Sequence, residues 1–199
     1  MIVSYRNRKG DIYYLHRTVT SRGKLRYYFA KYPKANPVYR VPDGYEIYEH
    51  PNGQVFLRKK GPNAFSRNQI IGIRKFCDRF LGPSNYILNI HGNTLVIYIA
   101  TIRTEEQEGT LVIAVRHSRT EIDSFIPTDI YAPVFRLSQS MQRGRKKYTI
   151  EKYYEDELPK RWVVMESSID LAALVKRYLQ KYQRYLRSHS KFHYGENST

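Results

Sequence analysis

Glu46, Glu49 and His50 are the residues whose types and spacing come closest to a catalytic group in this chain. Carboxylates beside a histidine can bind a divalent metal or share acid–base work on a phosphodiester. Glu46 and Glu49, however, are three residues apart in a stretch typical of a strand, so they are expected to face opposite sides of a sheet. The chain also lacks a Glu-x-Lys or Asp-x-Lys triplet, which the commonest restriction-type nuclease site needs. We interpret these acids as balancing nearby cations. A metal-dependent nuclease that uses them is an alternative.

Positive charge and tyrosine are concentrated in the first part of the chain. Residues 1–75 hold 16 Lys and Arg against 4 Asp and Glu, whereas residues 76–142 hold 5 against 7. Nine of the 19 tyrosines lie between Tyr5 and Tyr48. Cations neutralise phosphates and aromatic rings offer faces on which bases stack, so this pattern predicts DNA or RNA as the partner. The competing interpretation is a solvated sheet face with ordinary tyrosine packing.

Strand alternation indicates which of these side chains share a face. It places Arg26 and Tyr28 on one face and Leu25, Tyr27 and Phe29 on the other. The second set suits a core and the first suits solvent or a ligand. The residues expected to contact nucleic acid in the N-terminal part are Arg6, Arg8, Lys9, Tyr13, Arg17, Arg22, Lys24, Arg26, Tyr28, Arg58, Lys59 and Lys60. A later basic turn adds Arg143, Arg145 and Lys146, which also suit a well-solvated hairpin tip.

The elements that must position these residues form a small β-module in residues 1–60. Short runs rich in β-branched and aromatic residues, separated by glycine-containing turns, predict its strands. Asn52-Gly53 between two such runs is a strong hairpin signal. Pro33, Pro37 and Pro42 predict an extended connector that is not a central strand. The predicted strands cover residues 2–6, 12–17, 25–31, 45–49 and 54–59.

Residues 61–188 are predicted to form an α+β domain, followed by a polar tail over residues 189–199. Ser66 and Gln69 form a capping-box pattern, and Gly82-Pro83 ends the helix that follows. A second amphipathic helix is predicted from Ser168. The predicted strands cover residues 86–90, 94–100, 110–117, 134–141, 147–154 and 161–165. A brief helix is expected to start at Thr120 and to be closed off by Pro127 and Pro133. The fold class is therefore α+β, with a small N-terminal antiparallel β-module followed by a mixed antiparallel sheet with two main amphipathic helices.

Composition narrows the class of protein further. No run of 18 apolar residues is present, so no transmembrane helix is expected, and the N-terminus lacks the apolar segment of a signal peptide. One cysteine, Cys77, excludes an internal disulfide and a multi-cysteine zinc site. Nucleotide-hydrolysing loops and serine-hydrolase motifs are absent as well. We therefore expect a cytoplasmic protein with no metal and no cofactor.

Two stretches of the β-module resemble a pattern found in uncharacterised prokaryotic proteins. They are Gly23-Lys24-Leu25-Arg26-Tyr27-Tyr28-Phe29 and Pro42-Asp43-Gly44-Tyr45-Glu46-Ile47-Tyr48-Glu49, the second continuing through Pro51-Asn52-Gly53-Gln54-Val55-Phe56-Leu57-Arg58. The resemblance covers roughly the first sixty residues and implies a bacterial or archaeal cytoplasm. No activity is attached to that family, so it implies no catalytic residues.

These observations lead to the hypothesis of a non-enzymatic nucleic-acid-binding protein that uses a basic, aromatic N-terminal surface. One alternative is a protein-interaction subunit of a larger assembly, which would present its basic surface to an acidic partner. The other alternative is the metal-dependent nuclease.

Overall fold

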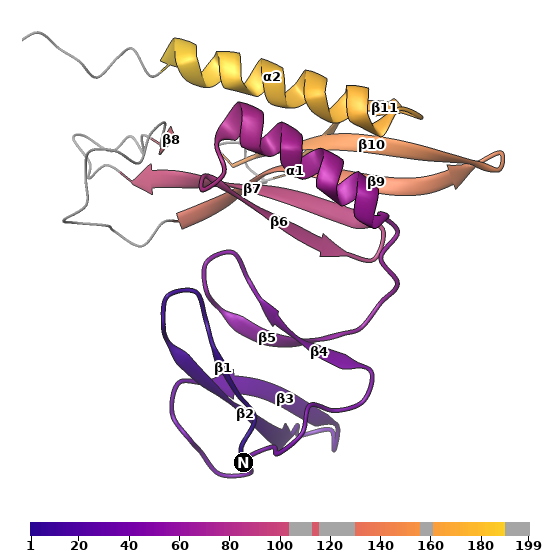
Figure 1. Cartoon of the computed structure of the whole chain (residues 1–199). Coiled ribbons are helices and arrows are strands. Elements are labelled where there is room, and N and C mark those ends of the chain that lie inside the picture. Colours follow the sequence, from indigo (N-terminus) through magenta and orange to yellow (C-terminus); the bar gives the residue numbers. More distant parts are fainter. Residues whose placement is uncertain (104–112, 116–129, 156–160, 190–199) are drawn as a thin grey trace, which may run out of the picture. The chain divides into compact units, whose positions relative to one another are not determined.

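A computed structural model describes residues 1–103, 113–115, 130–155 and 161–189 of the chain (Figure 1). Its contacts divide the chain into two compact units, Met1–Gly61 (unit 1) and Pro62–Thr199 (unit 2). The strands form antiparallel sheets and two long helices belong to unit 2, so the predicted α+β class is confirmed. Neither helix in the described part of the chain is long and apolar enough to cross a membrane.

Unit 1 consists of a three-stranded sheet and a two-stranded hairpin. The sheet has the order β1-β2-β3 and the hairpin pairs β4 with β5. The strands are β1 (Ser4–Arg6), β2 (Ile12–Val19), β3 (Leu25–Ala30), β4 (Tyr45–Glu49) and β5 (Val55–Lys59). Gly53 in the β4–β5 turn has a φ of 86°, and a Cβ there would lie 3.0 Å from Nδ2 of Asn7. Glycine is therefore required at this turn both for its backbone conformation and for the close approach of Asn7.

The proline-rich connector between β3 and β4 runs along the edge of β2. The Val38 N–H donates to the Leu15 carbonyl (2.9 Å), and the Arg17 N–H donates to the Asn36 carbonyl (3.1 Å). Pro37 forms an isolated bridge with His16 between these two bonds. An edge position tolerates proline because its missing N–H faces away from the ladder, as the sequence indicated.

Unit 2 is a six-stranded antiparallel sheet whose one face is covered by both helices (Figure 1). Its order is β11-β10-β9-β7-β6, with β8 paired to β7. Ile97, Leu137 and Ile150 of the sheet are buried in one core with Cys77 of α1 and Leu179 of α2. The elements are α1 (Arg67–Leu81), β6 (Tyr86–His91), β7 (Thr94–Arg103), β8 (Ile113–Val115), β9 (Ile130–Gln142), β10 (Arg145–Tyr154), β11 (Arg161–Ser168) and α2 (Leu171–His189).

The start of α1 is as expected, but the start of α2 is not. Ser66 and Gln69 exchange both bonds of a capping box. Ser168, by contrast, is the last residue of β11, and the side chain of Asp170 accepts a hydrogen bond from the Ala173 N–H (3.0 Å). Asp170 thus caps α2, because an aspartate three residues before a free helical N–H satisfies it as well as a serine would.

The prediction that Pro133 ends a helix is wrong, because Pro133 lies inside β9. It pairs with Tyr98 of β7 beside a register shift, and β9 pairs with β10 only from Phe135 onward. Among the described residues, Pro133 therefore has a strand partner on one side of β9 only, where a missing N–H costs little. The brief helix expected at Thr120, and most of the strand expected over residues 110–117, lie outside the described residues.

Candidate nucleic-acid interface

Cross-strand pairs define the two faces of the β2–β3 ladder. Leu15 pairs with Phe29 and His16 with Tyr28. Leu15 is completely buried, and we call its side of the ladder the inner face. On the opposite side (the outer face) the His16 ring is also buried, and the Tyr28 ring lies 5.5 Å from it, centroid to centroid. Neither ring nitrogen of His16 has a hydrogen-bond partner among the described residues.

The structure does not bring Tyr13 and Tyr28 together. Tyr13 precedes Leu15 by two residues and so shares the inner face, whereas Tyr28 lies on the outer face. Nζ of Lys31 lies 5.9 Å from the centroid of the Tyr13 ring. The two tyrosines expected to stack on bases therefore cannot form one continuous platform. Leu25, expected in the core, is 51% exposed because the β2–β3 hairpin extends beyond the core.

The predicted basic residues of the sheet separate to the two ends of β2. The end near Ile12 carries Arg6, Arg8 and Lys9. The end near Val19 carries Arg17, Arg22, Lys24 and Arg26. The seven residue steps between these ends span about 23 Å at the rise of a β-strand. The two groups therefore form two surfaces, which have to be considered separately.

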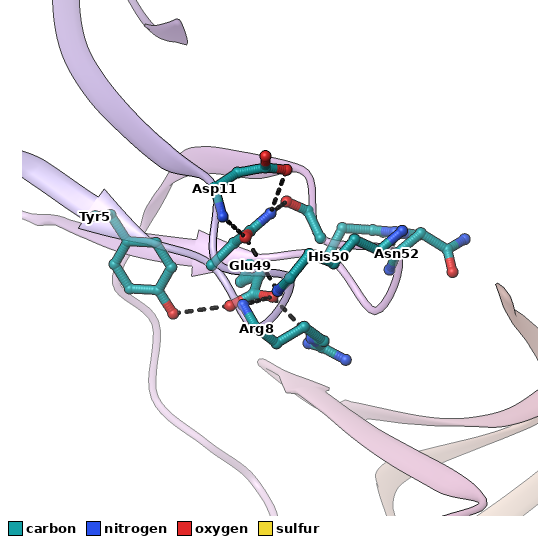
Figure 2. Close-up of polar contacts among 9 residues, drawn as sticks. Tyr5, Arg8, Asp11, Glu49, His50 and Asn52 are labelled. Atoms are coloured by element: carbon teal, nitrogen blue, oxygen red, sulfur yellow. Dashed lines mark hydrogen bonds and ion pairs between the residues drawn. The ribbon is translucent and has the colours of Figure 1, made fainter. Parts of the chain in front are cut away.

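At the first end, hydrogen bonds hold the β1–β2 turn against the β4–β5 hairpin (Figure 2). We call this group the clasp; it consists of Tyr5, Asn7, Arg8, Glu49 and Gly53. The Glu49 carboxylate accepts hydrogen bonds from Tyr5 Oη (3.0 Å), Arg8 N (3.0 Å) and Arg8 Nε (2.7 Å). Nearby, the buried Asn7 donates from Nδ2 to the Gly53 carbonyl (2.7 Å). These bonds join the β1–β2 turn to the β4–β5 hairpin. Arg8 is neutralised here, so we assign it to the clasp and not to ligand binding.

The clasp predicts that unit 1 loses stability in acid. Burial raises the pKa of Glu49, but hydrogen bonds from Arg8 and Tyr5 outweigh it and hold that pKa below its usual 4.5. Burial, and then Arg8, lower the pKa of His50 below 6.5. Both groups bind protons more weakly in the folded than in the unfolded chain. The stability of unit 1 should therefore decrease in two steps as the pH is lowered. The first step, from His50, begins below pH 6.5, and the second, from Glu49, begins below pH 4.5.

We expect Glu49→Gln to lower the stability of unit 1 at pH 7 by about 2 kcal/mol and to flatten the second acid step. Hydrogen exchange in peptides from β1 and β4 of the whole protein, followed from pH 7 to well below pH 4.5, measures both. Glu46→Gln is the matched control, because its ion pair with Arg58 is more exposed and should contribute less than about 1 kcal/mol. Equal effects of the two substitutions would contradict the clasp.

The second end of β2 carries a group of exposed cations, and we call it the basic end. The centroid of the Tyr27 ring lies 6.1 Å from that of the Tyr45 ring. Because Tyr45 of β4 pairs with Lys59, the end of β5 lies near this end of the sheet. The exposed cations of the basic end are Arg17, Arg22, Lys24, Arg26, Lys59 and Lys60. None of them forms an ion pair with any residue that the structure describes. Unpaired, exposed cations keep their full electrostatic attraction for an anionic ligand.

Two other predicted contact groups differ from the basic end. Arg58 pairs with Glu46 at 2.6 Å and lies 4.5 Å from the centroid of the Tyr48 ring, so it is held within the β4–β5 hairpin. Arg143, Arg145 and Lys146 belong to unit 2, where they form the exposed tip of the β9–β10 hairpin. Arg143 has a φ of 49° in this turn, as a tight hairpin requires.

The three candidate catalytic residues do not converge on one point. Glu46 and Glu49 point to opposite faces of the hairpin, as their spacing predicted, and each is engaged by an arginine. His50 accepts a hydrogen bond at Nδ1 from the Asn52 N–H (3.2 Å), which fixes its ring in the turn. No group of three or more His, Cys, Asp or Glu side chains suited to a metal occurs in the described residues. Cys77 is buried, which raises the pKa of its thiol to about 12 and makes it a poor nucleophile.

Comparison with known proteins adds no assignment: no protein-family model matches the chain, and neither a curated protein nor a solved structure is significantly similar to it.

Proposed function

We propose that this protein binds nucleic acid through the basic end of unit 1 and is not an enzyme. The observation that carries the proposal is a set of six exposed cations without ion pairs to any described residue, four at one end of the three-stranded sheet and two at the end of the β4–β5 hairpin. Such cations gain free energy when they replace the counterions of a phosphate backbone. A cytoplasmic location in a prokaryote is part of the same proposal.

Half-buried Tyr27 supports the proposal from the face of the basic end that also carries Arg17, whereas Arg26 lies on the other face of the ladder. Tyr27 pairs with Arg17 across the strands, so a ring lies beside a guanidinium on the inner face of the hairpin end. This combination suits a phosphate and its attached base better than it suits a phosphate ion alone. In contrast with the expectation from sequence, the aromatic contribution comes from Tyr27 and not from Tyr13 or Tyr28.

The test is a titration of duplex DNA, single-stranded DNA and structured RNA at several salt concentrations. If five cations of the basic end contact phosphates, the slope of log affinity against log salt should be about −4.5 on duplex and about −3.5 on single strands. Slopes near zero on all three ligands would contradict the proposal. Magnesium in one set of samples exposes cleavage, and Mg²⁺-dependent degradation lost in Glu46→Gln would establish a nuclease instead.

One observation favours the protein-interaction alternative. Val19 and Leu25 form a cross-strand pair beside the basic end, and their side chains are 64% and 51% exposed. Exposed apolar side chains next to cations suit an acidic protein partner with an apolar anchor. An acidic protein that binds wild type in high salt, and loses binding in Val19→Ser, would support this alternative over nucleic acid.

A further inference from the structure

A cleft in unit 1 lies directly beside the basic end. Its volume is about 380 Å³, within the range of sites for small ligands. Arg17 and Tyr27 of the sheet form one wall, and the connector from Pro37 to Asp43 forms the other. The hydrogen bonds that tie this connector to β2 build the wall before any ligand arrives, which reduces the ordering cost of binding.

The cleft combines aromatic rings with guanidinium groups. Tyr27 is half-buried in it, and Tyr39 is 67% exposed with no ring contact to a described residue. Arg17 and Arg40 supply two positive charges. The ion pair of Arg40 with Asp43, at 2.9 Å, is open to solvent, since both side chains are more than 80% exposed. A pair this exposed is weak, so an arriving phosphate can replace the carboxylate.

From this arrangement we infer that the cleft binds one nucleotide of a single-stranded nucleic acid. The base stacks on Tyr39 and Tyr27, its phosphate contacts Arg17 and Arg40, and the flanking phosphates continue along the basic end. A base inside a duplex cannot enter the cleft because it is stacked and paired, whereas an unpaired base can. The inference rests on the proposed function and adds strandedness and a base-binding site to it.

The decisive variant is Tyr39→Ala, because Tyr39 is exposed and its removal leaves the core intact. We expect it to weaken binding of a 10-nucleotide single strand about 10-fold or more, the usual loss for one stacked base, and to change duplex binding less than twofold. Tyr39→Phe should retain wild-type affinity. Tyr32→Ala is the matched control, since Tyr32 is 76% exposed and outside the cleft. Fluorescence anisotropy with the full chain measures all of these affinities.

An abasic single strand separates stacking from charge, because it keeps the phosphates and lacks the bases. Tyr39→Ala should not weaken binding to this probe, whereas Arg17→Gln should. If wild type binds with a steep salt dependence and Tyr39→Ala equals Tyr32→Ala on every probe, the cleft inference fails and the proposed function stands. If no nucleic acid binds at low salt, both fail.

Discussion

Replacing Lys24, Arg26 and Lys59 together by glutamine is expected to weaken binding to a single strand about 100-fold at 0.1 M salt. Each phosphate contact contributes about 0.7 to the slope of log affinity against log salt on single strands. Three lost contacts therefore lower the affinity by about two powers of ten at 0.1 M salt, which is one tenfold step below 1 M. The slope itself should become shallower by about 2. Anisotropy titrations from 50 to 300 mM salt measure both quantities. The three side chains are exposed and unpaired within the described residues, so the fold should tolerate their removal.

The matched control is a triple variant on α2, with Lys176, Lys181 and Arg184 replaced by glutamine. These side chains are exposed on the helix surface, and the two variants have the same net charge. If a single basic surface binds the ligand, the control should lose less than about threefold. Equal losses in the two variants would mean that binding follows the total charge of the protein, and the assignment to the basic end would be wrong.

Local patterns were sufficient for most of the fold. The alternation and turn residues of the first sixty residues predict all five strands of unit 1 within two residues of their observed bounds. Ser66 with Gln69 predicts the start of α1 because both partners of a capping box lie within one helical turn. The prediction for Pro133 fails because proline is tolerated in a strand where one side lacks a partner, and sequence does not reveal which strands pair.

The candidate site was less accessible to sequence, because it depends on register and on distant pairs. Alternation assigns Tyr13 and Tyr28 to faces of their own strands, but the pairing of Leu15 with Phe29 decides that the two faces differ. The neutralisation of Arg8 depends on Glu49, which is 41 residues away in sequence. The sequence signal for Tyr39 is an aromatic residue in a proline-rich connector, which patterns of charge and strand alternation do not detect.

The second large effect concerns the core of unit 2, where Leu179→Ala should lower the free energy of unfolding by about 3 kcal/mol. Leu179 is completely buried, in the same core as Ile97 and Cys77, so its truncation leaves a cavity under α2. Trp162, the single tryptophan of the chain, is in β11 and reports the unfolding of unit 2 by fluorescence in urea.

Val164→Ala is the control for this substitution, because Val164 is 61% exposed on the same strand as Trp162 and should cost about 0.5 kcal/mol or less. The comparison also tests where the ligand binds. The basic end and the cleft consist of residues of unit 1, so Leu179→Ala should keep wild-type affinity for single strands under conditions in which unit 2 stays folded. If Leu179→Ala instead lowered the affinity for single strands tenfold or more, unit 2 would contribute to the interface. The six cations of unit 1 would then be insufficient to account for binding.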